Sequence, residues 1–203
     1  MDLGLGFSWK NSEEMVSRKF TCGYCGQPIA SQKGYIGIYS RADGTKRYAY
    51  IYICHFCSRP TYLDHSGEQI PGTAFGNDVK DITDKVVHDL YNEARRCTSA
   101  NADTAAVLCC RKLLMHIAVA KGAPENQPFS AYVSFLSDKG FIPPDAKSWV
   151  DHIRTKGNEA NHEICIMKRE DSEDLLSFIE MLLKIIYEFP ATARKKYPQA
   201  IKS

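Results

Sequence analysis

The chain has 203 residues, enough for one medium-sized domain or two small ones. Hydrophobic residues make up 44% and charged residues 25%, an ordinary globular balance, and the net charge of +2 is too small to indicate a nucleic-acid or membrane surface by itself. Residues 1–10 lack the basic start and apolar core of a signal peptide, and charges interrupt the most apolar helix, residues 175–189. We therefore expect a soluble, cytoplasmic protein that does not bind membranes.

The two parts of the chain differ in composition, and the change lies near residue 76. Residues 1–76 carry eight Lys/Arg and six Asp/Glu, whereas residues 77–203 carry eighteen of each sign. The segment 64–77 is rich in Gly and Pro and is predicted to link two domains.

Two Cys-x-x-Cys pairs stand in the N-terminal part. They are Cys22 with Cys25 and Cys54 with Cys57, and 28 residues separate the pairs. This is the spacing of a tetrahedral zinc site in which each pair forms one knuckle and supplies two thiolates. Four thiolates leave no open position on the metal, so we predict a structural Zn²⁺ without metal catalysis. His55 is a ligand by type, but it lies between two cysteines that already complete the set.

The segment between the two pairs reads as a β-hairpin. Residues 35–40 and 46–53 alternate with a period of two, and an Asp-Gly turn lies between them. Three tyrosines at alternate positions are predicted to share one face: Tyr48, Tyr50 and Tyr52. Such a face, with basic residues at the hairpin tip, can stack nucleic-acid bases. Alternatively, the tyrosines pack against the helical part or a second subunit.

The C-terminal part reads as about five helices, joined by short loops that favour an antiparallel bundle. They are predicted near residues 79–99, 103–121, 130–139, 145–161 and 172–189, the last ending before Pro190. The predicted fold class is α+β. A small zinc ribbon with its linker occupies residues 1–76, and an all-α bundle occupies residues 77–203.

A polar stripe marks the fourth predicted helix. Arg154, Asn158 and His162 are spaced four apart and therefore share one helix face. A cation, an amide and an imidazole in a row suit phosphate binding, and the imidazole can move a proton near neutral pH. The alternative is a buried polar network that fixes this helix against its neighbours.

The pattern Ile-Arg-x-x-Gly-Asn-x-x-x-His over residues 153–162 resembles the domain of unknown function family 4145, commonly placed in the HEPN superfamily. The Cys-Arg-Lys-Leu-Leu core of residues 106–121 and the end of the last helix add to a likeness over about residues 85–192. Members often carry a zinc-ribbon-like N-terminal segment, which fits residues 20–60. The resemblance implies that the C-terminal bundle is HEPN-like.

Many HEPN proteins are metal-independent endoribonucleases that act as dimers, with one Arg-Asn-x-x-x-His motif from each subunit meeting at the interface. The resemblance places the family's Asn on Asn158 and its His on His162, whereas the position of its Arg falls on Gly157. Arg154 lies one turn earlier on the same face.

Three functions follow as hypotheses. The first is a homodimeric module that binds RNA, DNA or a protein partner, in prokaryotic defence or nucleic-acid metabolism as the resemblance suggests. The second is an endoribonuclease with His162 as general acid/base and with Arg154 and Asn158 holding the phosphate. The third is a protein adaptor whose tyrosine face is the interaction surface.

Overall fold

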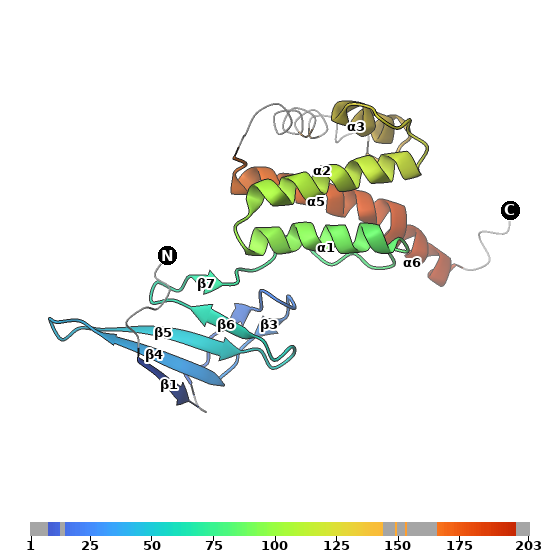
Figure 1. The fold of residues 1–203 in the computed structure, drawn as a ribbon. Coiled ribbons are helices and arrows are strands. Elements are labelled where there is room, and N and C mark those ends of the chain that lie inside the picture. The colour runs from blue at the N-terminus through green and yellow to red at the C-terminus, as the bar shows by residue number, and fades with distance from the viewer. Residues whose placement is uncertain (1–7, 13–14, 144–148, 150–152, 154–165, 198–203) are drawn as a thin grey trace. The chain divides into compact units, whose positions relative to one another are not determined.

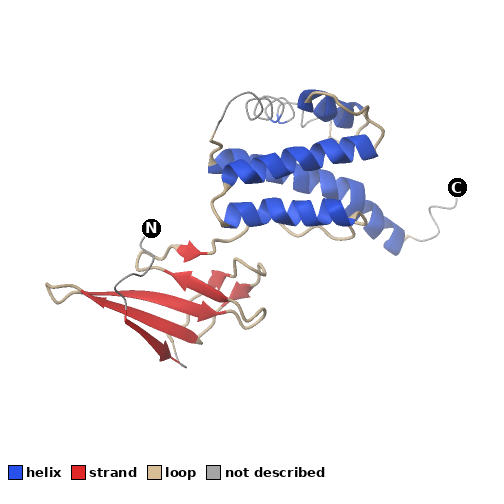
Figure 2. Ribbon diagram, viewed as in Figure 1, coloured by secondary structure: helices blue, strands red, loops and turns tan. Residues whose placement is uncertain are grey.

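The computed structural model describes residues 8–12, 15–143, 149, 153 and 166–197 (Figure 1). The chain divides into two compact units, Met1–Ala74 and Phe75–Ser203. In the described residues, the strands belong to the first unit and the helices to the second (Figure 2). The protein is therefore of mixed α+β class, as the sequence predicts.

The first unit, here called the sheet unit, is built on an antiparallel sheet whose central pair is the predicted hairpin. β4 (Gly34–Ser40) pairs with β5 (Lys46–Ile53). In the turn between them, Gly44 N–H donates to the Arg41 carbonyl at 3.0 Å, and the Asp43 carboxylate accepts from Thr45 N–H at 2.9 Å. An Asp-Gly turn with this bonding closes the hairpin because glycine accepts the positive φ of 80° without strain.

Three further strands extend the hairpin, and the sequence analysis missed them. β1 (Ser8–Ser12) pairs with β4 on one side, and β6 (Pro60–Leu63) and β7 (Gln69–Ile70) follow β5 on the other. A separate small ladder joins β2 (Phe20–Thr21) to β3 (Pro28–Ile29). β1, β6 and β7 are two to five residues long, too short for a clear period-two pattern, so pairing with their neighbouring strands decides their conformation.

The register of the sheet separates the tyrosines into two groups. Directly paired residues share a face, and Tyr50 pairs with Ile36 and Leu63, whereas Tyr35 pairs with Ile51. Tyr48, Tyr50 and Tyr52 therefore share one face, as predicted, and Tyr35 and Tyr39 lie on the opposite face. Tyr52 is buried and donates its hydroxyl to the Val16 carbonyl at 2.8 Å. It belongs to the core of the sheet unit: Met15, Phe20, Cys22, Ile29, Tyr52, Cys54 and Leu63.

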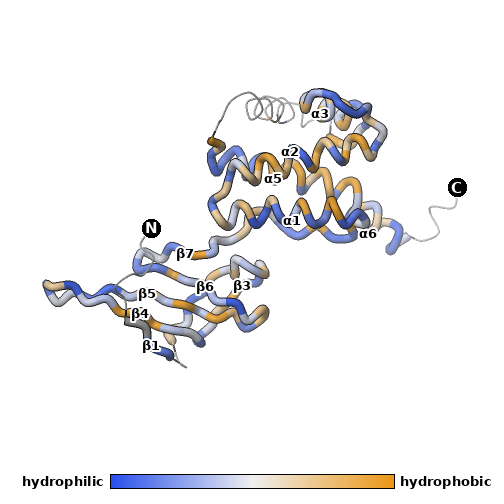
Figure 3. Tube along the Cα trace, viewed as in Figure 1, coloured by the Kyte–Doolittle hydropathy of each residue, from blue (hydrophilic) through white to orange (hydrophobic). Residues whose placement is uncertain are grey.

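The second unit, here called the helical unit, contains α1 (Lys85–Ser99), α2 (Asp103–Ala120), α3 (Phe129–Asp138), α5 (Arg169–Leu183), the π-helical turn η2 (Lys184–Glu188) and α6 (Phe189–Lys196). α1, α2 and α5 lie side by side (Figure 1). The apolar stretches of α2 and α5, visible in Figure 3, supply much of a single core that also receives Trp149 and Ile153. No helix among the described residues is both long and apolar enough to span a membrane.

The first helix begins later than the sequence predicts. Val79 is buried and fits the apolar period, but α1 starts only at Lys85. Asp84 is the N-cap, and its carboxylate accepts from Val86 N–H at 2.9 Å and Val87 N–H at 3.3 Å. A local cap therefore overrides the periodicity, and Val79 reaches the core from a loop.

The last helix continues past Pro190, where the sequence predicts its end. Phe189 N–H donates to the Lys184 carbonyl, a five-residue spacing that defines the π-helical turn η2. This wider turn precedes Pro190, which then occupies the first turn of α6, where no N–H donor is needed. A register shift of one residue thus admits a proline that would otherwise interrupt the helix.

Residues 75–77, predicted as part of a linker, are bound to the helical unit. Asn77 N–H donates to the Glu180 carboxylate at 2.7 Å, and the Tyr91 hydroxyl donates to the Asn77 carbonyl at 2.7 Å. Arg95 donates to the Gly76 carbonyl at 2.9 Å. These bonds fix the start of the helical unit at Phe75.

Candidate metal centre

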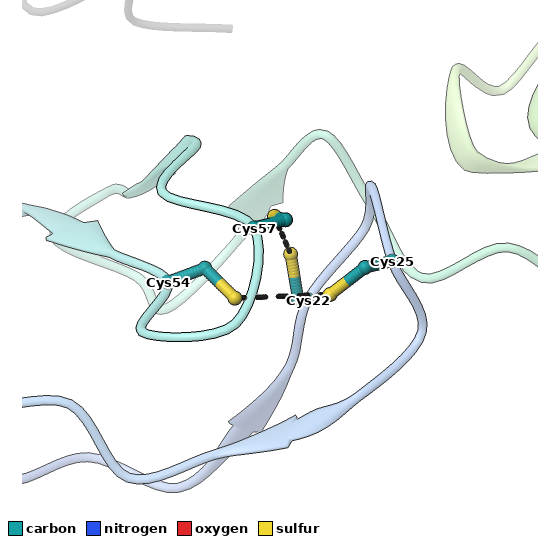
Figure 4. A group of neighbouring side chains, drawn as sticks. All are labelled: Cys22, Cys25, Cys54 and Cys57. Carbon is teal, nitrogen blue, oxygen red and sulfur yellow. Dashed lines mark hydrogen bonds between the residues drawn. The ribbon is translucent and has the colours of Figure 1, made fainter.

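Four cysteine side chains converge at one end of the sheet unit. Cys22 and Cys25 belong to the loop between β2 and β3, and Cys54 and Cys57 to the loop between β5 and β6. Their sulfurs all lie within 4.8 Å of one another, and the side chains point inward from the two loops (Figure 4). The structure thus brings together the four residues that the sequence predicts as ligands.

The distances between the sulfurs fit a metal ion and exclude disulfides. Cys22 Sγ lies 3.7 Å from Cys57 Sγ, and Cys25 Sγ lies 3.7 Å from Cys54 Sγ. A disulfide requires about 2.05 Å between sulfurs. A tetrahedral ion with metal–sulfur bonds of about 2.3 Å holds its sulfurs about 3.8 Å apart. The four cysteines therefore form a plausible metal-binding site, with each close pair drawn from both loops.

The two loops have the same backbone hydrogen bonds at equivalent positions. Gly26 N–H donates to the Cys22 carbonyl at 2.9 Å, and Cys22 N–H donates to the Gln27 carbonyl at 2.9 Å. In the second loop, Ser58 N–H donates to the Cys54 carbonyl at 2.8 Å, and Cys54 N–H donates to the Arg59 carbonyl at 3.0 Å. Each knuckle is thus a closed turn that orients both of its sulfurs toward the same point.

Two glycines serve the first knuckle in different ways. Gly26 has a φ of 70°, the left-handed conformation that closes the turn, and Ser58 adopts 57° at the equivalent place. Gly23 instead allows close packing, because a Cβ there would lie 2.3 Å from the Gly72 oxygen and 2.5 Å from the Pro71 oxygen. The segment that follows β7 therefore packs directly on the knuckle backbone, a contact that the sequence did not reveal.

The thiol pKa values differ within the cluster. Burial raises the pKa of Cys25 to about 12 and raises that of Cys57 as well. Burial also acts on Cys54, but the N–H groups of Cys57 and Phe56 donate toward its sulfur and lower its pKa to about 7, so Cys54 is the cysteine that ionises most readily. Cys22 and Cys54 are fully buried, Cys57 is half-buried and Cys25 is exposed. The first cysteine of each pair thus belongs to the core, and the second lies toward solvent.

His55, the further ligand by type, does not join this cluster. His55 is exposed and is not among the grouped metal-ligating side chains of the described residues. Arg154, Asn158 and His162 lie outside the described residues, so their prediction stays untested. The residue before the stripe, Ile153, is buried in the core of the helical unit.

Arg111 on α2 is a buried charge that the sequence analysis passed over. Its side chain is only 4% exposed, and its guanidinium carbon lies 4.3 Å from the centre of the Phe129 ring. Nη1 has no hydrogen-bond partner among the residues that the structure describes, and burial lowers the pKa of this group. Its spacing, four residues after Val107 and three before Leu114, places Arg111 on the same face of α2 as these two buried residues.

Fold and site together define a protein with a plausible four-cysteine metal-binding site in a β-rich unit, followed by a helical unit. Residues 92–202, which are 111 of the 203 residues, match the family described as Domain of unknown function (DUF4145), and the chain belongs to this family. The match begins within α1 and includes the predicted polar stripe. No curated protein and no solved structure significantly matches the chain.

Proposed function

We propose that this protein is a zinc-stapled module that binds nucleic acid through its sheet unit and dimerises through a HEPN-like helical unit. The metal is Zn²⁺, because four thiolates are the donor set that zinc prefers, and these sulfurs lie within 4.8 Å of one another with two pairs at 3.7 Å. All four positions are filled by protein, so the ion is structural.

The zinc proposal is tested by metal content and by local unfolding. Purified protein is expected to contain one zinc per chain. Binding of structural zinc is worth about 10–16 kcal/mol, comparable with or above the stability of a small domain, so a chelator should unfold the sheet unit. Hydrogen exchange should then rise in peptides around Cys22 and Cys54 but not in α2. Unchanged exchange in the chelated protein would contradict the structural role.

The observation that carries nucleic-acid binding is the charge of the sheet unit beside its exposed tyrosines. Residues 15–74 contain seven Lys/Arg and three Asp/Glu. Two of those acids are engaged in turns, where Asp43 accepts from Thr45 and Asp64 accepts from Ser66. With seven cations and three carboxylates, residues 15–74 carry a net charge of +4.

The hairpin end places cations beside aromatic rings on both faces. Tyr39 pairs with Arg47 on one face, and Tyr48 lies two residues from Lys46 on the other. Arg41 and Lys46 are exposed at the tip, and both tyrosines expose more than a third of their surface. Stacking rings with adjacent cations suit a nucleic-acid strand, whose bases stack and whose phosphates attract Lys and Arg.

The test is a titration of labelled single-stranded and duplex RNA and DNA at about 50 and 200 mM salt. We expect the affinity to fall as salt rises. For Arg41→Ala or Lys46→Ala, the slope of log affinity against log salt concentration should be shallower by about 0.7–0.9, because one phosphate contact is lost. Lys112→Ala, an exposed cation of the helical unit, is the matched control and should bind normally. Negligible binding at low salt would refute the proposal and favour the protein adaptor.

The dimer is supported by exposed apolar side chains of the helical unit. Leu108 on α2 and Ile166 before α5 expose 48% and 79% of their surfaces, and burial in a second copy would remove this surface from water. Mass measurement in solution should give a dimer at micromolar concentration. A monomer for the wild type would refute this part of the proposal.

A further inference from the structure

The two knuckles present one aromatic ring each at equivalent positions. Tyr24 precedes the second cysteine of the first knuckle, and Phe56 precedes the second cysteine of the second. Since both loops have the same backbone hydrogen bonds, the two rings occupy corresponding places on two similar turns. The metal site therefore holds two aromatic rings in place, one on each knuckle.

Both rings are unusually exposed for their size. Phe56 exposes 63% of its surface and Tyr24 exposes 46%, whereas Phe20 and Tyr52 of the same unit are buried. Full burial of a phenylalanine side chain is worth about 1.5–3 kcal/mol, and most of that gain is forgone at Phe56. The loops carrying these rings are closed by hydrogen bonds and by the cysteine cluster, so little conformational entropy remains to be lost on binding.

Cationic and planar groups surround the two rings. The Arg59 guanidinium, which follows the second knuckle, lies 5.1 Å from the centre of the Tyr24 ring on the first. The His55 and Phe56 rings lie 4.5 Å apart at 37°. Residues 20–33 and 53–62 contain no Asp or Glu. The patch is thus aromatic and basic, and Arg59 connects its two halves.

The composition of the patch favours nucleobases over a protein surface. Between Cys22 and Pro28, and between Cys54 and Pro60, the chain contains no Val, Leu, Ile or Met. A protein-binding patch usually has a contiguous apolar centre, whereas these are separate rings set among polar residues. The uncharged faces of bases also suit this position, since a four-thiolate zinc centre has a net negative charge that repels phosphate.

We propose that Tyr24 and Phe56 are stacking platforms for two unpaired bases of a single strand, with Arg59 stacked on Tyr24 and directed toward the backbone phosphate. This inference rests on the proposed nucleic-acid function and narrows its ligand to single strands, because bases within a duplex do not expose their faces. The surface is distinct from the hairpin tip, which supplies cations for the backbone.

The experiment compares the affinity of zinc-loaded variants for a short labelled oligouridine and for a duplex of equal length. Tyr24→Ala and Phe56→Ala should each weaken single-strand binding about 5- to 150-fold, the range expected for loss of one stacked base. Tyr24→Phe should keep most of the affinity because it keeps the ring. Val16→Ala, an 80% exposed apolar residue of the same unit, is the matched control and should not change binding.

Zinc content, measured for each variant, separates loss of stacking from loss of the fold. If Tyr24→Ala and Phe56→Ala hold zinc and bind oligouridine like the wild type, while Lys46→Ala weakens binding, this inference is overturned and the proposed function stands. If the wild type binds the duplex but no single strand at low salt, only this inference is overturned. If it binds neither, the proposed function is overturned as well. Equal binding of duplex and single strand would also overturn the stacking platforms.

Discussion

Substitution of Gly23 by alanine tests whether packing against the knuckle, and not only its cysteines, holds the metal site. The added Cβ would lie 2.3 Å from the Gly72 oxygen, whereas ordinary contacts begin at 3.4 Å, so the two backbones must separate by about 1.1 Å. Overpacking of this kind costs about 1–3 kcal/mol. Since metal binding and folding of the sheet unit are coupled, zinc affinity should fall about 5- to 150-fold.

The assay is competition for zinc with a chromophoric chelator under reducing conditions. Gly26→Ala provides the comparison, since a Cβ there meets no atom within 4 Å and the cost comes only from its φ of 70°. Gly26→Asn should recover much of that loss because asparagine tolerates the left-handed conformation, whereas Gly23→Asn should bind zinc no better than Gly23→Ala. Wild-type zinc affinity for Gly23→Ala would refute the reasoning.

Three further predictions concern stability, each measured by urea unfolding. Asp84→Ala should destabilise the helical unit by about 1 kcal/mol through loss of the α1 N-cap. Asp84→Asn should retain most of the stability, because the asparagine side chain can also cap the helix. Because the Val87 N–H lowers the pKa of Asp84, this contribution should be present above about pH 3.9 and be lost on further acidification; a loss on raising the pH would contradict it. Tyr52→Phe, which removes the bond to the Val16 carbonyl, should cost the zinc-loaded sheet unit about 1 kcal/mol, and no change would mean that this bond contributes nothing. Leu176→Ala should leave a cavity in the helical core that costs about 2–5 kcal/mol, whereas Val86→Ala, at a 63% exposed position on α1, should change stability by less than about 0.5 kcal/mol.

The elements that sequence reasoning predicted well are those with a local cause. The Asp-Gly turn and the alternating strands on either side give β4 and β5, and α2 runs from Asp103 as its apolar period indicates. The elements it misplaced depend on distant partners or on a competing local bond. β6 is a strand because it pairs with β5, and β7 because it pairs with β6. The cap at Asp84 sets the start of α1, and a π-helical turn allows the last helix to continue past Pro190.

In the candidate site, too, features with a local cause were predicted and features that depend on distant contacts were not. Cysteine spacing predicts the ligand set because a knuckle is a local turn, and two knuckles need only a hairpin between them to meet. The role of Gly23 could not be predicted, since its neighbour is a backbone segment almost fifty residues later. The pairing of Arg59 with Tyr24 joins two separate loops and is likewise invisible in either loop alone.

The sequence by itself determined the four cysteines, the hairpin between them, the α+β class and the family of the helical unit, because ligand spacing, turn chemistry and periodicity are encoded over short stretches. Only the tertiary structure decided that the four sulfurs meet within 4.8 Å, that Tyr52 is buried whereas Tyr48 is exposed, and that Arg59 lies over the exposed Tyr24 ring. These features depend on contacts between residues far apart in the chain, and strand register and close packing fix them where no local pattern can.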